Sequence, residues 1–336
     1  MEISTVPAFL VRALLQGAAL RGCDTDAVLC QLALSPEVVN ADRGRIPAAQ
    51  YSQLVDQLSA ELNDEYCGLV EQPSRPGTFA LICYACIHTP TLGAFIERAV
   101  PFHSVTTDCS ETSVEVTDGT AHYIFTPRGE DSEPQRLLVM SFLAIIHRLA
   151  SWLIGQNMPL ESASLAHPRP EHAATYNLLF RAPVRFDSDR NCISFSANYL
   201  AAPVVRNEAE LEQFLQMPGA QLMASPVNSN SHVAKVTNLI KPSVAEEFPD
   251  FEWIAAQLHT TTGTLRRRLR EEGTSYQQLK DELRRDTAIY NLNRGRMSIE
   301  DVAESIGFSE PTSFFRAFKR WTGVTPRAYT ARQKNA

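Results

Sequence analysis

Lysine is absent from the first 231 residues of this chain, and all five lysines lie between Lys235 and Lys334. Residues 232–336 carry 17 Lys and Arg against 13 Asp and Glu, a net charge of +4, whereas residues 1–231 carry a net charge of −11. This asymmetry is typical of a basic module joined to an acidic one, and it confines electrostatic attraction for a polyanion to the C-terminal third.

The sequence also lacks targeting signals. Residues 1–7 contain no basic leader, and we find no apolar run that approaches the roughly 20 residues of a membrane helix. Seven cysteines, an odd number without a secretory signal, argue against a disulfide framework, so we interpret them as reduced thiols. These absences predict a cytoplasmic protein with no membrane partner.

Signatures of catalysis and of metal binding are missing as well. The sequence has no nucleophile-elbow serine, no GxGxxG and no Walker motif, and its histidines show no metal-ligand spacing. Cys83 and Cys86 form a single CxxC inside an apolar run, and His88 alone does not complete a tetrahedral site. We therefore predict no enzyme activity, no cofactor and no metal site, and we favour buried thiols over a redox or zinc role for this pair.

A segment rich in Pro, Ser, Asn and Gly, residues 217–231, has no charge and no sustained period. We interpret it as a linker between a domain at 1–216 and a domain at 232–336. The first domain mixes helical periodicity with clusters of β-branched and aromatic residues, which indicates an α+β fold. Its expected elements are helices within 5–62, strands at 102–107, 113–116 and 122–126 with a hairpin turn at Asp118-Gly119, a long helix at about 135–154, and a second hairpin at 184–187 and 192–196.

The second domain shows helical periodicity throughout and no strand signal. The expected fold is therefore an α+β domain followed by an all-α domain with two helix-turn-helix motifs, at 251–273 and 299–320. Its expected helices lie at about 232–246, 251–258, 262–271, 275–292, 299–306, 311–320 and 325–333.

The segment Ser298–Pro326 has the pattern of two helices at a sharp turn. Ser298 with Asp301 predicts a capping box, and Gly307 permits the turn. Ser309 is the expected cap of the following helix, in which Pro311 occupies the first turn. Ile299, Val302, Ala303 and Ile306 form the buried face of the first helix, and Phe314, Phe318 and Trp321 form that of the second.

The remaining surface of that second helix is polar and basic, which is the division that a DNA recognition helix needs. A less regular copy of the motif begins at Phe251 and includes Gly263–Gly273, where Leu265 and Leu269 are the expected buried pair. A spacer of roughly 17 residues, about 26 Å of helix, separates the copies, so one chain can span major-groove segments that repeat every ~34 Å. The expected DNA-binding residues are Thr262, Thr264, Arg266, Arg267, Arg270, Ser309, Thr312, Phe315, Arg316, Lys319 and Arg320.

Residues 232–334 resemble the DNA-binding domain of the AraC/XylS family of bacterial transcription regulators. The resemblance is carried by Gly307-Phe308, Phe314, Arg316–Trp321, Gly323 and Pro326. It implies two helix-turn-helix units in adjacent major-groove segments, and base-reading positions at Gly263, Arg267, Thr312 and Arg316. Gly263 offers no side chain there, and Thr264 and Arg266 are the residues expected to substitute for it.

The first domain resembles the effector-sensing and dimerisation domain of the AraC-type branch that includes ornithine-utilisation and virulence regulators. The matching residues are Leu81–Tyr84, Thr91–Gly93, Phe180–Phe186, Ile193, Phe195 and Leu200–Pro203. The resemblance implies a homodimeric transcription activator that binds promoter DNA beside RNA polymerase and responds to a small molecule. The alternative is a ligand-independent repressor or an architectural DNA-binding protein.

Overall fold

The structure is a computed structural model that describes residues 5–216, 232–272 and 274–330. The expected linker at 217–231 lies outside the described residues. The chain divides into two compact units. We call residues 1–12, 24–54 and 228–336 the helical unit, and residues 13–23 and 55–227 the sheet unit. Most of the first 54 residues thus belong with the C-terminal helices, although the sequence assigned them to the N-terminal domain.

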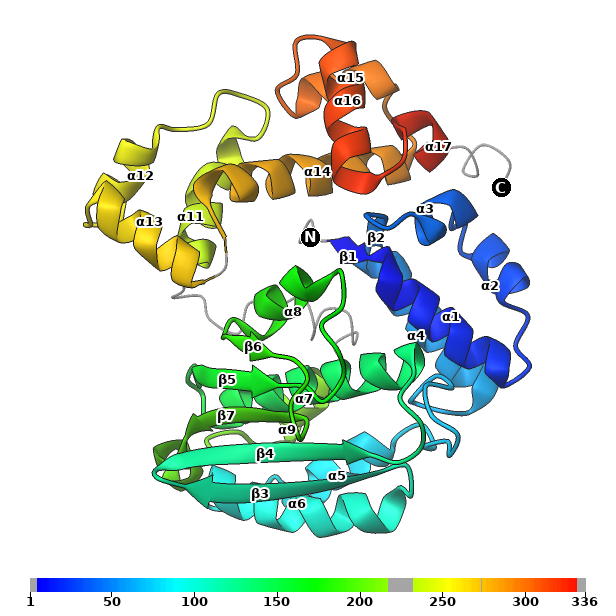
Figure 1. Cartoon of the computed structure of the whole chain (residues 1–336), viewed down its shortest axis with the longest axis vertical. Coiled ribbons are helices and arrows are strands. Elements are labelled where there is room, and N and C mark those ends of the chain that lie inside the picture. The colour runs from blue at the N-terminus through cyan, green and yellow to red at the C-terminus, as the bar shows by residue number, and fades with distance from the viewer. Residues whose placement is uncertain (1–4, 217–231, 273, 331–336) are drawn as a thin grey trace. The chain divides into compact units, whose positions relative to one another are not determined.

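The sheet unit contains one five-stranded sheet in the order β3-β4-β7-β5-β6 (Figure 1). Neighbouring strands are antiparallel except β5 and β6, which are parallel. The expected hairpin turn at Asp118-Gly119 is confirmed, because both residues have the positive φ angles, 51° and 79°, that a type I′ turn requires. The strands are β3 (Ser110–Thr117), β4 (Thr120–Pro127), β5 (Leu160–Ser164), β6 (Val184–Arg185) and β7 (Cys192–Ser196).

The expected second hairpin is wrong. Val184 of β6 pairs in parallel with Ala163 of β5, and β7 lies between β4 and β5. The turn residues between β6 and β7 are real, but a local turn signal does not choose the strand's partner. The choice follows from burial, since Cys192, Ile193 and Phe195 are all buried and a central place in the sheet covers them.

The strand expected at 102–107 is also wrong, because these residues end the helix α6 (Leu92–Thr106). Phe95, Ile96 and His103 form a buried stripe at helical spacing that continues past Pro101. Val105 is 85% exposed, so its β-branched side chain lies on the solvent face of a helix. Packing of the stripe outweighs the local strand preference of the last residues.

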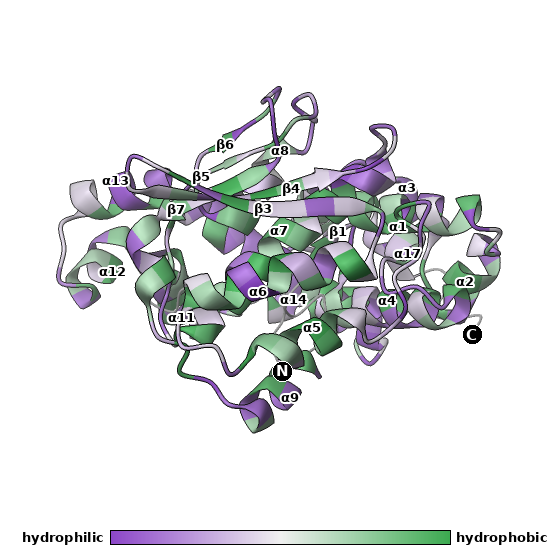
Figure 2. Ribbon diagram, turned by 90° about the horizontal axis from the view of Figure 1, so that it is seen from below, coloured by the Kyte–Doolittle hydropathy of each residue, from purple (hydrophilic) through white to green (hydrophobic). Residues whose placement is uncertain are grey.

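The other helices of the sheet unit surround α7 (Glu133–Leu153), which packs against β4, β7 and α8. Its 21 residues are long and apolar enough for a membrane span, a length that we did not expect from the sequence, but 67% of the apolar window is buried inside the structure. It is therefore the core helix of this unit, and Figure 2 shows its hydrophobic colouring. The remaining helices are α5 (Thr78–Cys86), α8 (Ala173–Phe180), α9 (Glu208–Leu215) and the 3₁₀ turn Ala197–Ala201.

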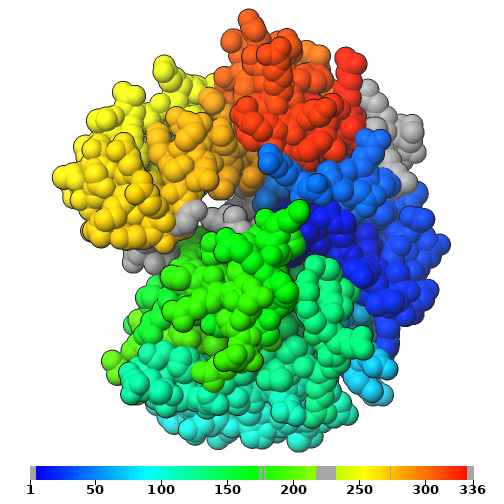
Figure 3. Space-filling model, viewed as in Figure 1, coloured from blue at the N-terminus to red at the C-terminus, as the bar shows by residue number. Residues whose placement is uncertain are grey.

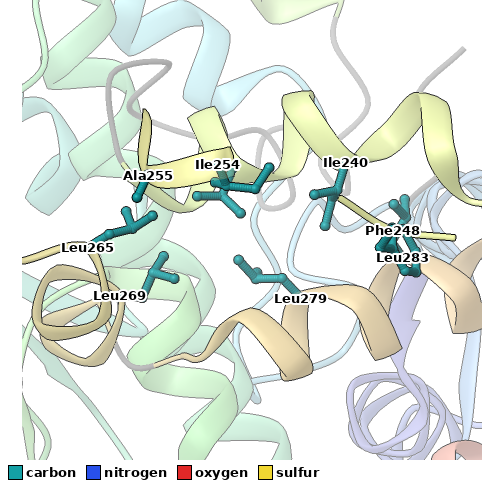
Figure 4. Packing of buried hydrophobic residues seen from close by; sticks show 9 residues of the cluster. Ile240, Phe248, Ile254, Ala255, Leu265, Leu269, Leu279 and Leu283 are labelled. Atoms are coloured by element: carbon teal, nitrogen blue, oxygen red, sulfur yellow. The ribbon is translucent and has the colours of Figure 1, made fainter. Parts of the chain in front are cut away.

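In the helical unit, the long helix α14 (Tyr276–Arg294) connects two helix pairs (Figure 1). The helical segments expected after residue 232 are confirmed, except that the first ends at Ile240 and continues as the 3₁₀ turn Lys241–Ser243. In Figure 4, apolar side chains of α11, α12, α13 and α14 point toward one another. The helices are α11 (His232–Ile240), α12 (Phe251–Gln257), α13 (Thr262–Glu271), α15 (Ile299–Ser305), α16 (Pro311–Thr322) and α17 (Pro326–Thr330).

The N-terminal part of the helical unit is a short antiparallel pair of strands, β1 (Thr5–Pro7) and β2 (Arg45–Pro47), with small helices around it. β2 packs against α14, and α3 (Pro36–Asn40) packs against α17. Figure 3 shows this N-terminal segment in blue beside the C-terminal helices in red. The division between units falls within α1 (Ala8–Leu20) and within α4 (Ala48–Leu62), and α2 (Thr25–Gln31) completes the segment.

Candidate nucleic-acid interface

The turns of the two helix-turn-helix units have the same backbone hydrogen bonds. After α12, the amides of His259 and Thr260 donate to the carbonyls of Ala256 and Ala255 over 3.0 Å each. After α15, the amides of Gly307 and Phe308 donate in the same way to the carbonyls of Glu304 and Ala303, over 2.9 and 3.0 Å. Each is the double hydrogen bond of a Schellman motif, so the two copies share one turn geometry despite their different sequences.

The residue with positive φ differs between the two turns. Gly307 has φ 82° and adopts it without a steric penalty, whereas His259 occupies the corresponding position with φ 50°. The left-handed conformation costs a non-glycine residue about 1–2 kcal/mol. The first unit therefore has the more strained turn, which explains why its sequence pattern is less regular.

The helix caps agree with the sequence at α15 and differ at α16. Ser298 and Asp301 form the expected capping box, with the Asp301 amide 3.0 Å from the Ser298 hydroxyl and the Ser298 amide 3.2 Å from the Asp301 carboxylate. Ser309 is not the cap of α16, because Glu310 occupies that position and makes no side-chain cap bond. The helix starts one residue later than we expected, with Pro311 fixing its first turn.

The second recognition helix, α16, has a buried and an exposed face. Phe314, Ala317 and Phe318 are buried, and Trp321 is half-buried with its ring edge-on to Phe308. The expected DNA-binding residues lie on the other side. Ser309, Thr312, Arg316, Lys319 and Arg320 are exposed, and Phe315 is half-buried.

The first recognition helix, α13, divides in the same way. Leu265 and Leu269 are buried, as expected, in the cluster shown in Figure 4. The Thr261 hydroxyl caps the helix by accepting from the Thr264 amide over 3.1 Å, and it also donates to the Thr264 hydroxyl. The expected DNA-binding residues Arg266, Arg267 and Arg270 are exposed, and Thr262 and Thr264 are half-exposed.

The four arginines of α13 have different neighbours. Arg267 forms an exposed ion pair with Glu271 at 3.0 Å, and Arg266 lies 5.6 Å from the centre of the Phe251 ring. Arg268 turns inward and contacts His232 at 2.7 Å. The structure thus takes Arg268 away from the exposed face and partly neutralises Arg267 on it.

A pocket with a volume of about 340 Å³ opens beside this face. Arg266 and Arg270 line it together with Thr274, Ser275 and the first turn of α14. The backbone amides at a helix N-terminus and two guanidinium groups all favour an anion. This combination offers the first unit a place for a phosphate in addition to any base contact.

Three contacts join the N-terminal segment to α14 and α17. The Thr5 hydroxyl donates to the Asp286 carboxylate over 2.7 Å, and Arg45 Nε donates to the Thr5 hydroxyl over 2.7 Å. The Tyr329 hydroxyl donates to the Arg45 carbonyl over 3.1 Å. Asp286 also accepts from Arg285 at 2.8 Å, so one carboxylate collects bonds from three side-chain partners or near neighbours of β1, β2 and α14.

This group is largely buried, with 21% of the Arg45 side chain and 17% of the Asp286 side chain exposed. Burial, and then the charge of Arg285, lower the pKa of Arg45 to about 10, so it stays protonated at neutral pH. Sequence reasoning missed the whole group. No local signal identifies Thr5 or Arg45 as partners of a helix more than 230 residues away.

The cysteine pair of the sheet unit lies on α5. Cys83 and Cys86 are buried and free. Burial raises the pKa of the Cys83 thiol to about 12, and burial also raises that of Cys86. Neither thiol is therefore activated as a thiolate at neutral pH. Within the described residues, no three His, Cys, Asp or Glu side chains are grouped closely enough to hold a metal ion.

Comparison with known families matches both parts of the chain. Residues 22–204, more than half of the chain, match the family described as the arabinose-binding domain of AraC transcription regulator, N-term. Residues 254–332 match a helix-turn-helix domain. The chain belongs to the AraC family of transcription regulators. It is a DNA-binding transcription regulator, as the two helix-turn-helix units indicate.

Individual relatives agree with this membership. The chain is 27% identical over 329 residues to the ornithine utilization regulator of Pseudomonas aeruginosa, covering 96% of each chain. It is 28% identical over 203 residues to the regulator VqsM of the same organism, covering 59% of this chain and 61% of VqsM. Among solved structures, the regulator CdpR from Pseudomonas aeruginosa is 22% identical over 97% of this chain and 98% of its own. The TM-score with CdpR is 0.34, which is too low to compare how the units are arranged.

Proposed function

We propose that this AraC-family member activates transcription by reading two adjacent major-groove segments of promoter DNA with α13 and α16. The observation that carries the proposal is the repeated turn: two Schellman turns with the same hydrogen bonds each hold a helix whose apolar stripe is buried and whose basic face is exposed. α14 separates the copies by 19 residues, about 28 Å of helix.

Within this proposal the two units have different roles. Thr312 and Arg316 of α16 are exposed without a described ion-pair partner, and they are suited to base edges. Lys319 and Arg320 lie nearer the end of the helix and are suited to phosphates. In α13, Arg266 and Arg270 line the pocket at the start of α14, which favours a phosphate, while Thr262, Thr264 and Arg267 remain the candidates for base contact.

We also propose that the sheet unit senses a small molecule and forms a homodimer, and that the active protein contacts RNA polymerase in the cytoplasm. The family membership of residues 22–204 supports the sensing role. A ligand-independent repressor or architectural protein is the alternative. It predicts that no small molecule changes the affinity of the protein for its operator.

Footprinting of the full chain on its own promoter region tests the DNA-reading proposal. We expect two protected segments per protomer, one helical turn apart, on one face of the DNA. The Arg316→Ala variant should lose base preference in one segment only. Protection that is uniform along the DNA, with equal affinity for unrelated sequences, would contradict sequence-specific reading.

A further inference from the structure

Arg148 is a buried cation in the core of the sheet unit. It lies in the C-terminal half of α7, and its Nε and Nη1 atoms are buried with no hydrogen-bond partner among the described residues. Leaving a buried charge without a partner costs several kcal/mol, roughly 3–5 when a pair is broken. A protein that keeps such a group in its core has a reason other than stability to keep it.

The surroundings of Arg148 make its charge harder to hold. Burial, and then the charge of Arg181, lower the pKa of Arg148 to about 9. Its neighbour His147 supplies no negative charge, because its Nε2 atom donates to the Met158 carbonyl over 2.7 Å and burial lowers its pKa to about 4. At neutral pH Arg148 therefore remains a cation beside a neutral imidazole and a second cation.

Another arginine of the same helix shows the usual solution. Arg136 lies near the start of α7 and forms ion pairs with Asp131 at 2.5 Å and with Glu133 at 3.0 Å. Residues 1–231 contain more acidic than basic side chains, with a net charge of −11, so carboxylate partners are plentiful in this part of the sequence. Arg148 nevertheless has no described ion-pair partner. The missing anion is therefore one that the chain does not supply itself.

We propose that Arg148 binds the carboxylate group of the small-molecule effector, with Arg181 adding a second positive charge to the site. A planar guanidinium donates two parallel hydrogen bonds to a carboxylate, and this geometry sets the specificity for an anion. The overall negative charge of the region does not prevent this, because surface charges are screened over about 8–10 Å whereas a buried charge acts at contact distance. This inference rests on the proposed ligand sensing by the sheet unit and names the chemical class of the ligand.

The first test needs no ligand. Urea unfolding of the full chain is compared for wild type, Arg148→Met and the matched variant Arg136→Met. Replacing a buried charge without a partner by an apolar side chain of similar length should leave the unfolding midpoint equal or higher, whereas Arg136→Met should lower it. If Arg148→Met unfolds earlier than wild type, or does not fold, the guanidinium has a structural partner and the proposal is overturned.

The second test uses formate, the smallest carboxylate, as the probe. The melting temperature is measured in sodium formate and in sodium chloride at the same ionic strength. Formate should raise the melting temperature of wild type and of Arg136→Met, and it should have no effect on Arg148→Met. Equal shifts in all three proteins, or no shift in wild type, would overturn the proposal.

A third measurement separates this inference from DNA binding. Without formate, Arg148→Met should bind operator DNA as wild type does, because Arg148 is not part of the helical unit. Loss of operator binding by wild type would contradict the proposed function, and a formate effect that persists in Arg148→Met would contradict only the anion site. The two failures are therefore distinguishable.

Discussion

The hydroxyl of Thr5 donates a hydrogen bond of 2.7 Å to the carboxylate of Asp286, 281 residues later in the chain. The same hydroxyl accepts from Arg45, so it links β2 to α14 through β1. α14 is the helix that joins the two helix-turn-helix units. The first strand of the chain therefore belongs structurally to the DNA-binding unit, and its contacts contribute to the stability of that unit.

Replacing Thr5 by Val should lower the free energy of unfolding by about 1–3 kcal/mol, because Asp286 loses a buried donor and Arg45 loses an acceptor while the side-chain shape is kept. Urea unfolding measures the loss. Thr120→Val is the matched control, since its hydroxyl makes a 3.0 Å bond to Glu161 at the surface and should matter by less than about 0.5 kcal/mol. Equal effects of the two variants would show that the buried link adds no stability.

Replacing Ser298 by Ala should lower the free energy of unfolding by about 0.5–2 kcal/mol, because the capping box of α15 loses its hydroxyl acceptor. Ser309→Ala should change it by less than about 0.5 kcal/mol, since Ser309 makes no cap bond to α16. Thermal and urea unfolding distinguish the two. A larger loss from Ser309→Ala would restore the original prediction that Ser309 caps α16.

Arg316→Ala should weaken operator binding by about 1–3 kcal/mol and relax the preference at one base pair. Lys319→Ala should weaken binding to all sequences alike and reduce the salt dependence, as loss of one phosphate contact does. Titrations against a set of single-base operator variants at several salt concentrations measure both effects. If Arg316→Ala binds every operator variant as wild type does, α16 presents a different face to DNA.

Glu271→Gln should tighten DNA binding and steepen its salt dependence by up to about one phosphate contact, because it releases Arg267 from its ion pair and removes a negative charge from the DNA side. Glu272→Gln is the neighbouring control. Glu272 accepts from the amides of His232 and Val233 at the start of α11, so its replacement should lower stability without tightening DNA binding. Weaker binding by Glu271→Gln would indicate that Arg267 must be held by Glu271 to contact DNA.

Two buried histidines predict loss of stability in acid. Burial lowers the pKa of His103 to about 4 and that of His147 to about 4, from 6.5 for an exposed histidine. Between pH 6.5 and 4 the unfolded chain binds these protons and the folded chain does not, so stability falls as the pH falls. Each histidine should contribute a slope of up to about 1.4 kcal/mol per pH unit.

Urea unfolding of wild type and His103→Phe between pH 6.5 and 4 checks this contribution. His103 donates to or accepts from Ser110 at 3.0 Å and lies against Phe142, so an aromatic replacement keeps the packing. The variant should lose about one proton's worth of the slope. An unchanged slope would mean that His103 is already protonated in the folded protein.

The sequence alone was sufficient for the helix-turn-helix units, because their signals are local. Buried stripes, the capping box at Ser298 and the turn at Gly307 all act within one or two helical turns. It was sufficient for the Asp118-Gly119 hairpin for the same reason. It failed for 102–107, where a buried stripe beginning at Leu92 kept α6 helical, and for the pairing of β6 and β7, where the partner was chosen by burial.

The amino-acid sequence by itself determined that this chain carries a basic, two-part DNA-reading module and that its regulatory part is acidic and free of lysine. The tertiary structure decided that Thr5 and Arg45 complete the DNA-binding unit, and that Arg148 remains in the core without an anionic partner. The physical reason is the range of the interactions. Caps and amphipathic stripes depend on residues a few positions apart, whereas buried hydrogen bonds and buried charges depend on partners that only the folded chain brings together.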